Sequence, residues 1–225
     1  MSAARASAEP ALEALLELLA EARAPISVAS ARRARDVHIA DSLSGLEIES
    51  LASANRIADL GSGAGLPGLP LAACLPSSRF DLIESVGRRC EFLHEAIERM
   101  GLANATVVCE RSEDWAAGEG REGYEAVTAR AVGSLATVAE LASPLLAEGG
   151  VLAVWRGARS SEEEAEVARA AERLAIEPIE IRSVRPYEGS RDRHIHLLRK
   201  NGPTPNELPR RPGLAAKRPF GSEQH

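Results

Sequence analysis

The chain alternates between helix-like and strand-like patterns of hydrophobic positions over most of its length. Residues 9–22 place leucines at helical spacing after Pro10, and residues 31–46 predict one or two short helices. The next buried, strand-like segments are NRIADLG, RFDLIES, ATVVCE, YEAVTAR and VLAVWRG. Helical patterns separate these segments. The order predicts an α/β fold with a doubly wound, mostly parallel sheet and helices on both faces.

Helix ends can also be placed from the pattern. The clearest helix is RRCEFLHEAIERMG, whose apolar residues share one face and whose end Gly101 should cap. Another helix is expected from about Ser134 to Ala147, and a third should open at Ser161 as its N-cap. The segments IEPIEIRSV and RHIHLLRK alternate and should pair as an antiparallel hairpin, which brings the sheet to seven strands.

The chain divides by composition into three parts. Residues 1–50 form a helical segment, residues 51–200 form the α/β domain, and residues 201–225 form a basic, proline-rich tail. Proline-rich stretches resist regular structure, so we expect this tail to be extended or disordered and outside the core. No apolar run approaches the ~20 residues that would cross a bilayer, and the first residues lack the apolar stretch of a signal peptide.

Composition adds expectations about compartment and charge. The three cysteines fall in apolar segments, so we interpret them as reduced core residues of a cytoplasmic protein. The net charge is −6, but residues 191–225 hold eight Lys or Arg against three acids. A basic end on an acidic body is a weak indication of an anionic partner such as nucleic acid, and a solvated tail is the plain alternative. No metal site is expected, and nothing demands more than a monomer.

The most informative segment is RIADLGSGAGLPGLPLA, which joins a predicted strand to a helix. A dinucleotide loop reads G-x-G-x-x-G, but Leu66 occupies the position of its third glycine. A Walker loop needs Gly-Lys-Ser/Thr, and no lysine is near. Asp59 precedes the glycines in the pattern Asp-x-Gly-x-Gly-x-Gly, which is typical of S-adenosylmethionine-dependent methyltransferases.

The charges of that cofactor fit the segment. S-adenosylmethionine carries a sulfonium, an ammonium and a carboxylate instead of phosphates. Glycines let the backbone approach its amino-acid part closely, and Asp59 could lie near its cationic part. The three alternating glycines are Gly61, Gly63 and Gly65. A tight strand-to-helix turn without a ligand is the alternative interpretation.

Polar residues at the ends of later strands support the same cofactor. Glu84 ends the second strand, where an acid accepts hydrogen bonds from a ribose diol. Ser112 and Glu113 follow the third strand and could reach the adenine amino group. Arg130 ends the fourth strand and could contact the cofactor carboxylate or the substrate, although a surface ion pair with a glutamate is the alternative.

The acceptor can be narrowed by what the sequence lacks. The fourth strand ends in TARAVGSL instead of the Asn/Asp-Pro-Pro-aromatic element that grips an exocyclic amino group. No cysteine lies on a predicted loop to act as a nucleophile toward a pyrimidine carbon. Methylation of guanine N7 requires neither of these features, because its lone pair attacks the methyl group directly and no general base is needed. Oxygen and other nitrogen targets remain open.

The motifs together resemble the RsmG (GidB) family of bacterial ribosomal RNA methyltransferases over roughly residues 35–218. The matching segments are HIADSL, DLGSGAGLPGLPLA, ESVGRRCEFL, TARAVGSL and TPNELPRRPGLAAKRPF. The resemblance implies S-adenosylmethionine-dependent formation of N7-methylguanosine in 16S ribosomal RNA, either free or in an assembling small subunit. One departure is the region APISVASARRA, where the family usually shows Asn-Leu-Thr.

The resemblance also implies roles for individual residues. The implied cofactor contacts are Gly61, Leu66, Glu84, Ser112, Glu113 and Arg130. The implied RNA contacts are His38, Arg210, Arg211, Lys217 and Arg218. A methyltransferase of another RNA, a protein or a small molecule stays open, as does a non-catalytic RNA- or ribosome-binding module that retains the cofactor pocket.

Overall fold

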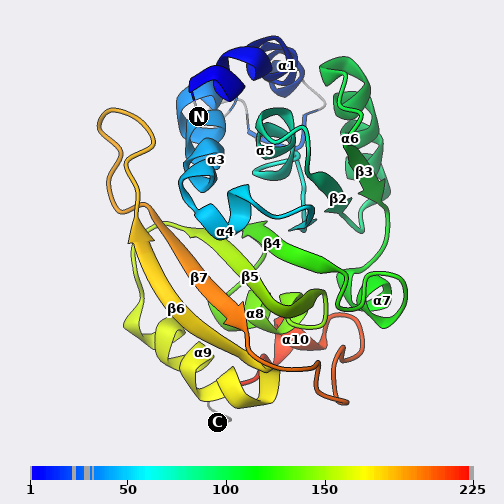
Figure 1. Cartoon of the computed structure of the whole chain (residues 1–225), viewed down its shortest axis with the longest axis vertical. Coiled ribbons are helices and arrows are strands. Elements are labelled where there is room, and N and C mark those ends of the chain that lie inside the picture. Colours follow the sequence, from blue (N-terminus) through cyan, green and yellow to red (C-terminus); the bar gives the residue numbers. More distant parts are fainter. Residues whose placement is uncertain (1, 22–23, 28–30, 32, 223–225) are drawn as a thin grey trace.

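The protein forms one seven-stranded sheet with helices on both faces (Figure 1). The computed structural model describes residues 2–21, 24–27, 31 and 33–222. The strand order is β3-β2-β1-β4-β5-β7-β6, with β7 antiparallel to both of its neighbours and the remaining pairs parallel. The strands are β1 (Arg56–Leu60), β2 (Arg79–Ile83), β3 (Ala105–Val108), β4 (Tyr124–Arg130), β5 (Leu146–Arg156), β6 (Ile176–Ser183) and β7 (His194–Lys200). The predicted fold class and the final hairpin are confirmed.

The position of the ligand crevice follows from the point at which the strand order reverses. The chain leaves β1 toward β2 and β3 on one side and returns to β4 on the other. In doubly wound sheets, ligands bind beyond the carboxyl ends of the strands at this switch point. The loops after β1 and β4 are therefore the first place to look for a site.

Helices form a layer on each side of the sheet, with α1 packed outside α5 and α6 (Figure 1). One side carries α1 (Ser2–Ala20), η1 (Ala34–Ala40), α3 (Asp41–Leu43), η2 (Ser44–Glu47), α4 (Glu49–Ala52), α5 (Gly68–Cys74) and α6 (Gly87–Met100). The other side carries α7 (Ser112–Ala117), α8 (Leu135–Ala142), α9 (Ser161–Leu174) and α10 (Leu214–Lys217). Aliphatic side chains fill both interfaces with the sheet. No helix in the described part of the chain is long and apolar enough to cross a membrane.

Helix boundaries differ from the sequence expectations in three places. α1 begins at Ser2, so Pro10 lies inside it and not at its start, because the preceding alanine-rich residues already favour helix. Ser160, and not Ser161, caps α9 by accepting a hydrogen bond from the backbone of Glu163. α8 ends at Ala142 because Pro144 follows shortly after.

The tail is ordered, which corrects the expectation of an extended or disordered segment. Leu208, Ala215 and Phe220 are buried, and Leu208 and Phe220 belong to the core on the α8–α9 side. The guanidinium groups of Arg173 and Arg210 both lie against the ring of Phe220, at 3.8 and 3.9 Å from its centroid. Burial of a few apolar side chains thus orders the tail despite its proline content. Residues 223–225 of the predicted tail lie outside the described residues.

The cysteines also differ from expectation. Cys74 is a free, buried thiol as predicted. Cys90 and Cys109 instead form a disulfide between α6 and the chain just after β3, with their Cα atoms 5.8 Å apart. The apolar pattern around these residues indicated burial but carried no signal that two elements 19 residues apart would bring the sulfurs together.

Candidate functional site

The loop after β1 is held in a conformation that needs glycine. Gly61, Gly63 and Gly65 all have positive φ angles, between 58° and 79°. A Cβ atom at Gly65 would lie 2.1 Å from Leu69, so that position also has no room for a side chain. A Cβ atom at Gly63 would meet little but open space, with its nearest contact at 3.8 Å. The loop therefore presents bare backbone to the crevice at Gly63.

Asp59 supports this loop from behind. Its carboxylate is buried and accepts hydrogen bonds from the backbone N–H of Gly68 at 3.2 Å and the hydroxyl of Thr128 at 2.8 Å. Burial raises the pKa of Asp59 to about 6, although these donors oppose the shift. Asp59 thus fastens the start of α5 to the sheet, and it is not among the residues that line the cavity described below.

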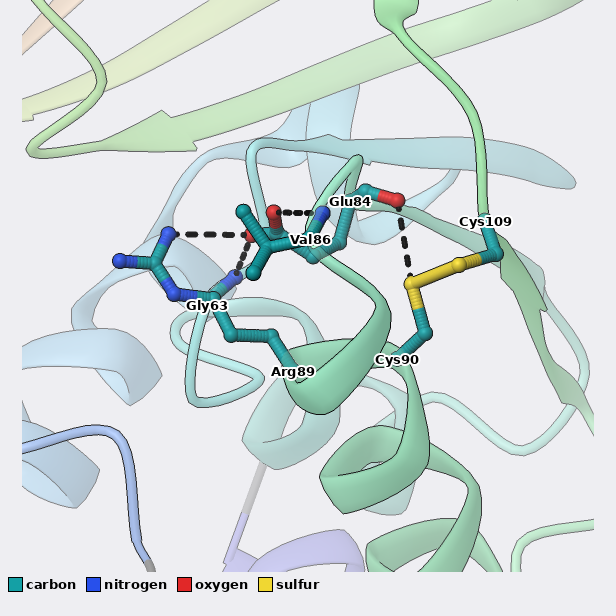
Figure 2. Close-up of a disulfide and its surroundings, with 6 residues drawn as sticks. All are labelled: Gly63, Glu84, Val86, Arg89, Cys90 and Cys109. Atoms are coloured by element: carbon teal, nitrogen blue, oxygen red, sulfur yellow. Dashed lines mark hydrogen bonds and ion pairs between the residues drawn. A yellow bond between two sulfur atoms is a disulfide. The ribbon is translucent and has the colours of Figure 1, made fainter.

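Glu84 reaches the glycine loop from the neighbouring strand (Figure 2). It is 4% exposed, and its two oxygens accept hydrogen bonds from the backbone of Gly63 at 3.0 Å and of Val86 at 2.9 Å. The guanidinium of Arg89 lies 3.5 Å away. A carboxylate has about four acceptor positions, so these three donors leave Glu84 about one position for a hydroxyl of a diol. Glu84 therefore lies directly beside the glycine loop, and its contact with a ribose stays a prediction.

Ser112 and Glu113 begin α7, beyond the end of β3. The Ser112 hydroxyl donates to the Glu113 carboxylate at 3.1 Å. The other oxygen of Glu113 accepts from the backbone N–H of Gly213 in the tail at 2.7 Å. Glu113 therefore links the predicted adenine position to the ordered tail, a contact that sequence reasoning did not find.

Arg130 ends β4 and pairs with Asp41 in the N-terminal part of the chain. The side chain of Arg130 is 16% exposed, and its Nη1 lies 3.1 Å from Asp41 Oδ2. The backbone carbonyl of Asp41 accepts from the indole of Trp155 at 2.9 Å. Arg130 is ion-paired, but not at the surface with a glutamate as the alternative interpretation held, because its partner is the buried Asp41 in the lining of the cavity. The HIADSL segment is therefore part of the site.

His38 completes this cluster. Its Nδ1 lies 3.4 Å from Nη2 of Arg130. Since a guanidinium only donates, Nδ1 must accept, and the neutral ring then carries its proton on Nε2. Nε2 is buried and has no hydrogen-bond partner among the residues that the structure describes. Burial, then Arg130 and Arg193, lower the pKa of His38 to about 4, so the ring is neutral at physiological pH.

The glycine loop and the cluster of His38, Asp41 and Arg130 line one cavity of about 560 Å³. The glycine loop forms one wall, and the cluster of His38, Asp41 and Arg130 forms another. The size is typical of small-molecule sites. Among the described residues, Glu84, Ser112 and Glu113 lie outside its lining, so the cavity covers the loop and Arg130 but not the predicted ribose and adenine positions.

Sequence reasoning missed a group of arginines at the cavity. Arg89, Arg156 and Arg193 line it together with Arg130, and each comes from a different part of the chain. Arg156 ends β5, so the rule that found Arg130 at the end of β4 could also have found it. Arg193 immediately precedes an antiparallel strand, where that rule gives no signal.

The tail cations predicted to bind RNA separate into two kinds. Arg210 donates to both oxygens of the buried Glu140 at 2.6 Å, so its geometry gives it a structural role. Arg211, Lys217 and Arg218 are exposed. The RNA contacts of these three residues stay a prediction.

The fold is the seven-stranded, Rossmann-like fold of class I methyltransferases. The protein is similar to cofactor-bound Rv0187 from MTB, with a TM-score of 0.57 and 21% identity over 85% of this chain and 89% of the other. It is also similar to Aeropyrum pernix fibrillarin with bound S-adenosyl-L-methionine, with a TM-score of 0.51 and 20% identity over 71% of this chain and 73% of the other. At these identities the likeness shows the fold.

Sequence comparison identifies the family. The family model for rRNA small subunit methyltransferase G matches residues 9–196. Ribosomal RNA small subunit methyltransferase G of Pelotomaculum thermopropionicum is 40% identical over 81% of this chain and 77% of the relative. The protein of the same name from Rubrobacter xylanophilus is 40% identical over 81% and 72%. The chain therefore belongs to the rRNA small subunit methyltransferase G family, and the predicted family is confirmed.

Proposed function

We propose that this protein transfers the methyl group of S-adenosylmethionine to N7 of a guanine in small-subunit (16S) ribosomal RNA. The observation that carries the proposal is the cavity at the switch point, where the glycine loop faces Arg130 and further arginines. Such a cavity can hold a cofactor on one side and admit an RNA base on the other, while the arginines attract phosphates.

The proposed cofactor contacts follow the geometry of the loops. Gly61 and Leu66 would contact the amino-acid part, and Arg130 its carboxylate. Glu84 would accept from the ribose diol, because it already lies against Gly63. Ser112 and Glu113 would hold the adenine. Asp59 would act through the loop it supports. S-adenosylmethionine supplies an activated methyl group on its sulfonium when it is bound.

The residues around the cavity suit an acceptor that needs no deprotonation. His38 is a weak base because its pKa lies near 4. The charge of Arg130 is neutralised by Asp41, which limits repulsion of the sulfonium and of the cationic product. Guanine N7 attacks with a lone pair, so alignment of donor and acceptor supplies most of the catalysis. The buried Nε2–H of His38, which has no partner in the described part of the chain, supports a substrate oxygen as its partner.

We further propose that the enzyme acts as a monomer in the cytoplasm, on free RNA or on an assembling small subunit. The test is transfer of label from S-adenosylmethionine to naked 16S RNA, assembled small subunits or total protein. Label in one of the two RNA substrates is expected. Label in protein alone, or in none of the three, would contradict the proposal.

A further inference from the structure

The disulfide joins the two chain segments that carry the proposed ribose and adenine contacts (Figure 2). Cys90 lies in α6, six residues after Glu84. Cys109 directly follows β3 and precedes Ser112 and Glu113. One covalent bond therefore connects the segments on which two parts of the same ligand would rest.

The sulfur of Cys90 also contacts the backbone of Glu84, whose carboxylate is the proposed ribose contact. Its Sγ lies 3.2 Å from the backbone carbonyl oxygen of Glu84. The side chain of the same glutamate accepts hydrogen bonds from Gly63 and Val86. A movement of the first turns of α6 would thus displace Glu84 and, through Glu84, the glycine loop.

The disulfide fastens the segments beyond the point where the sheet holds them. A backbone hydrogen bond from Glu84 to Val108, 3.0 Å long, joins the ends of β2 and β3. After it the chains separate toward α6 and α7, which lie apart in Figure 1. Without the disulfide, these segments would depend on weaker contacts to keep their spacing.

The two cysteine residues differ in exposure in the direction that an exchange reaction needs. Cys109 is an exposed residue, whereas Cys90 is 3% exposed. A thiolate can therefore attack the Cys109 sulfur, with the Cys90 sulfur as the leaving group. The positive end of the α6 dipole favours negative charge on that sulfur. Once protonated, the Cys90 thiol can donate to the Glu84 carbonyl, so the reduced form is also accommodated.

We propose that Cys90 and Cys109 form a site of reversible thiol–disulfide exchange that sets the affinity of the protein for its cofactor. The oxidant or reductant is a dithiol–disulfide couple. One thiolate of the dithiol attacks Cys109, the bond to Cys90 breaks, and the second thiolate resolves the mixed disulfide. Two protein thiols and one oxidised dithiol result. This inference rests on the proposed cofactor contacts of Glu84, Ser112 and Glu113.

The test is calorimetric titration of S-adenosylmethionine into the full-length protein, oxidised or reduced with dithiothreitol. Reduction should weaken binding at least about fivefold, the lower range of coupling between sites. Cys109→Ser, at the exposed position, should bind like the reduced protein and ignore dithiothreitol. Cys74→Ser is the matched control and should keep the redox response. A thermal melt of each sample establishes that it is folded at the titration temperature.

Equal affinity in oxidised and reduced folded protein would overturn the inference. Methyl transfer to 16S RNA, measured at saturating cofactor, keeps the two proposals separate. Redox-dependent affinity without transfer in either state would contradict the proposed function alone. Transfer with redox-independent affinity would contradict the exchange site alone.

Discussion

The carboxylate of Asp59 accepts a hydrogen bond from the backbone N–H of Gly68, 3.2 Å away, at the point where the glycine loop becomes α5. A Cβ atom at Gly68 would lie 2.7 Å from this carboxylate, so the glycine permits the contact. Asp59 therefore holds the end of the glycine loop in place through this hydrogen bond. A buried acid in this position also makes the loop sensitive to pH.

Replacing Asp59 with Asn should remove a pH dependence of stability. The folded-state pKa of Asp59 is about 6, above its ordinary value of 3.8, so its contribution to stability falls as pH rises through that window. The free energy of unfolding of Asp59→Asn relative to the native protein should increase by about 2 kcal/mol between pH 4.5 and 7. Urea unfolding at both pH values measures this difference. An equal change in the free energy of unfolding with pH in the two proteins would refute it.

Breaking the pair between Asp41 and Arg130 should destabilise the fold. Asp41→Ala leaves the buried guanidinium without its counter-charge, which typically costs about 3 kcal/mol or more. Adding Arg130→Met to Asp41→Ala should recover part of that loss, because no charge is then stranded. A double-mutant cycle by urea denaturation measures the coupling. Additivity within about 0.5 kcal/mol would show that the pair is not coupled.

Two adjacent arginines in the tail should respond very differently to alanine. Arg210→Ala strands Glu140, which is 2% exposed, and should cost about 3 kcal/mol in the free energy of unfolding. Arg211→Ala alters an exposed side chain and should stay within about 0.5 kcal/mol. Similar losses in the two variants would mean that the tail is not anchored through Arg210.

Removing the exposed tail cations should weaken RNA binding without unfolding the protein. The triple variant Arg211→Ala, Lys217→Ala, Arg218→Ala should reduce the slope of log affinity against log salt by about 0.7 for each RNA phosphate that the variant no longer neutralises. Filter binding of 16S RNA at several salt concentrations gives the slope. An unchanged slope, with the native melting temperature, would assign the tail to structure alone.

Local rules predicted much of the fold and part of the site. Glu84 and Arg130 were found because parallel strands bring their carboxyl ends to one edge of the sheet. The partner of Arg130 could not be found in this way, since Asp41 lies 89 residues earlier and pairs only once the chain has folded. The same holds for the Cys90–Cys109 disulfide. The prediction for the tail was wrong because the sequence shows its proline content but not the packing of Phe220 against Arg173 and Arg210.

The central claim is that guanine N7 is the atom methylated. The most direct measurement is nucleoside mass spectrometry of 16S RNA after incubation with the protein and S-adenosylmethionine. N7-methylguanosine should accumulate with the native protein. It should be absent with Gly63→Trp, whose side chain would enter the open space beside the loop. Methyl label in another nucleoside, or none from a protein that binds the cofactor, would contradict the account.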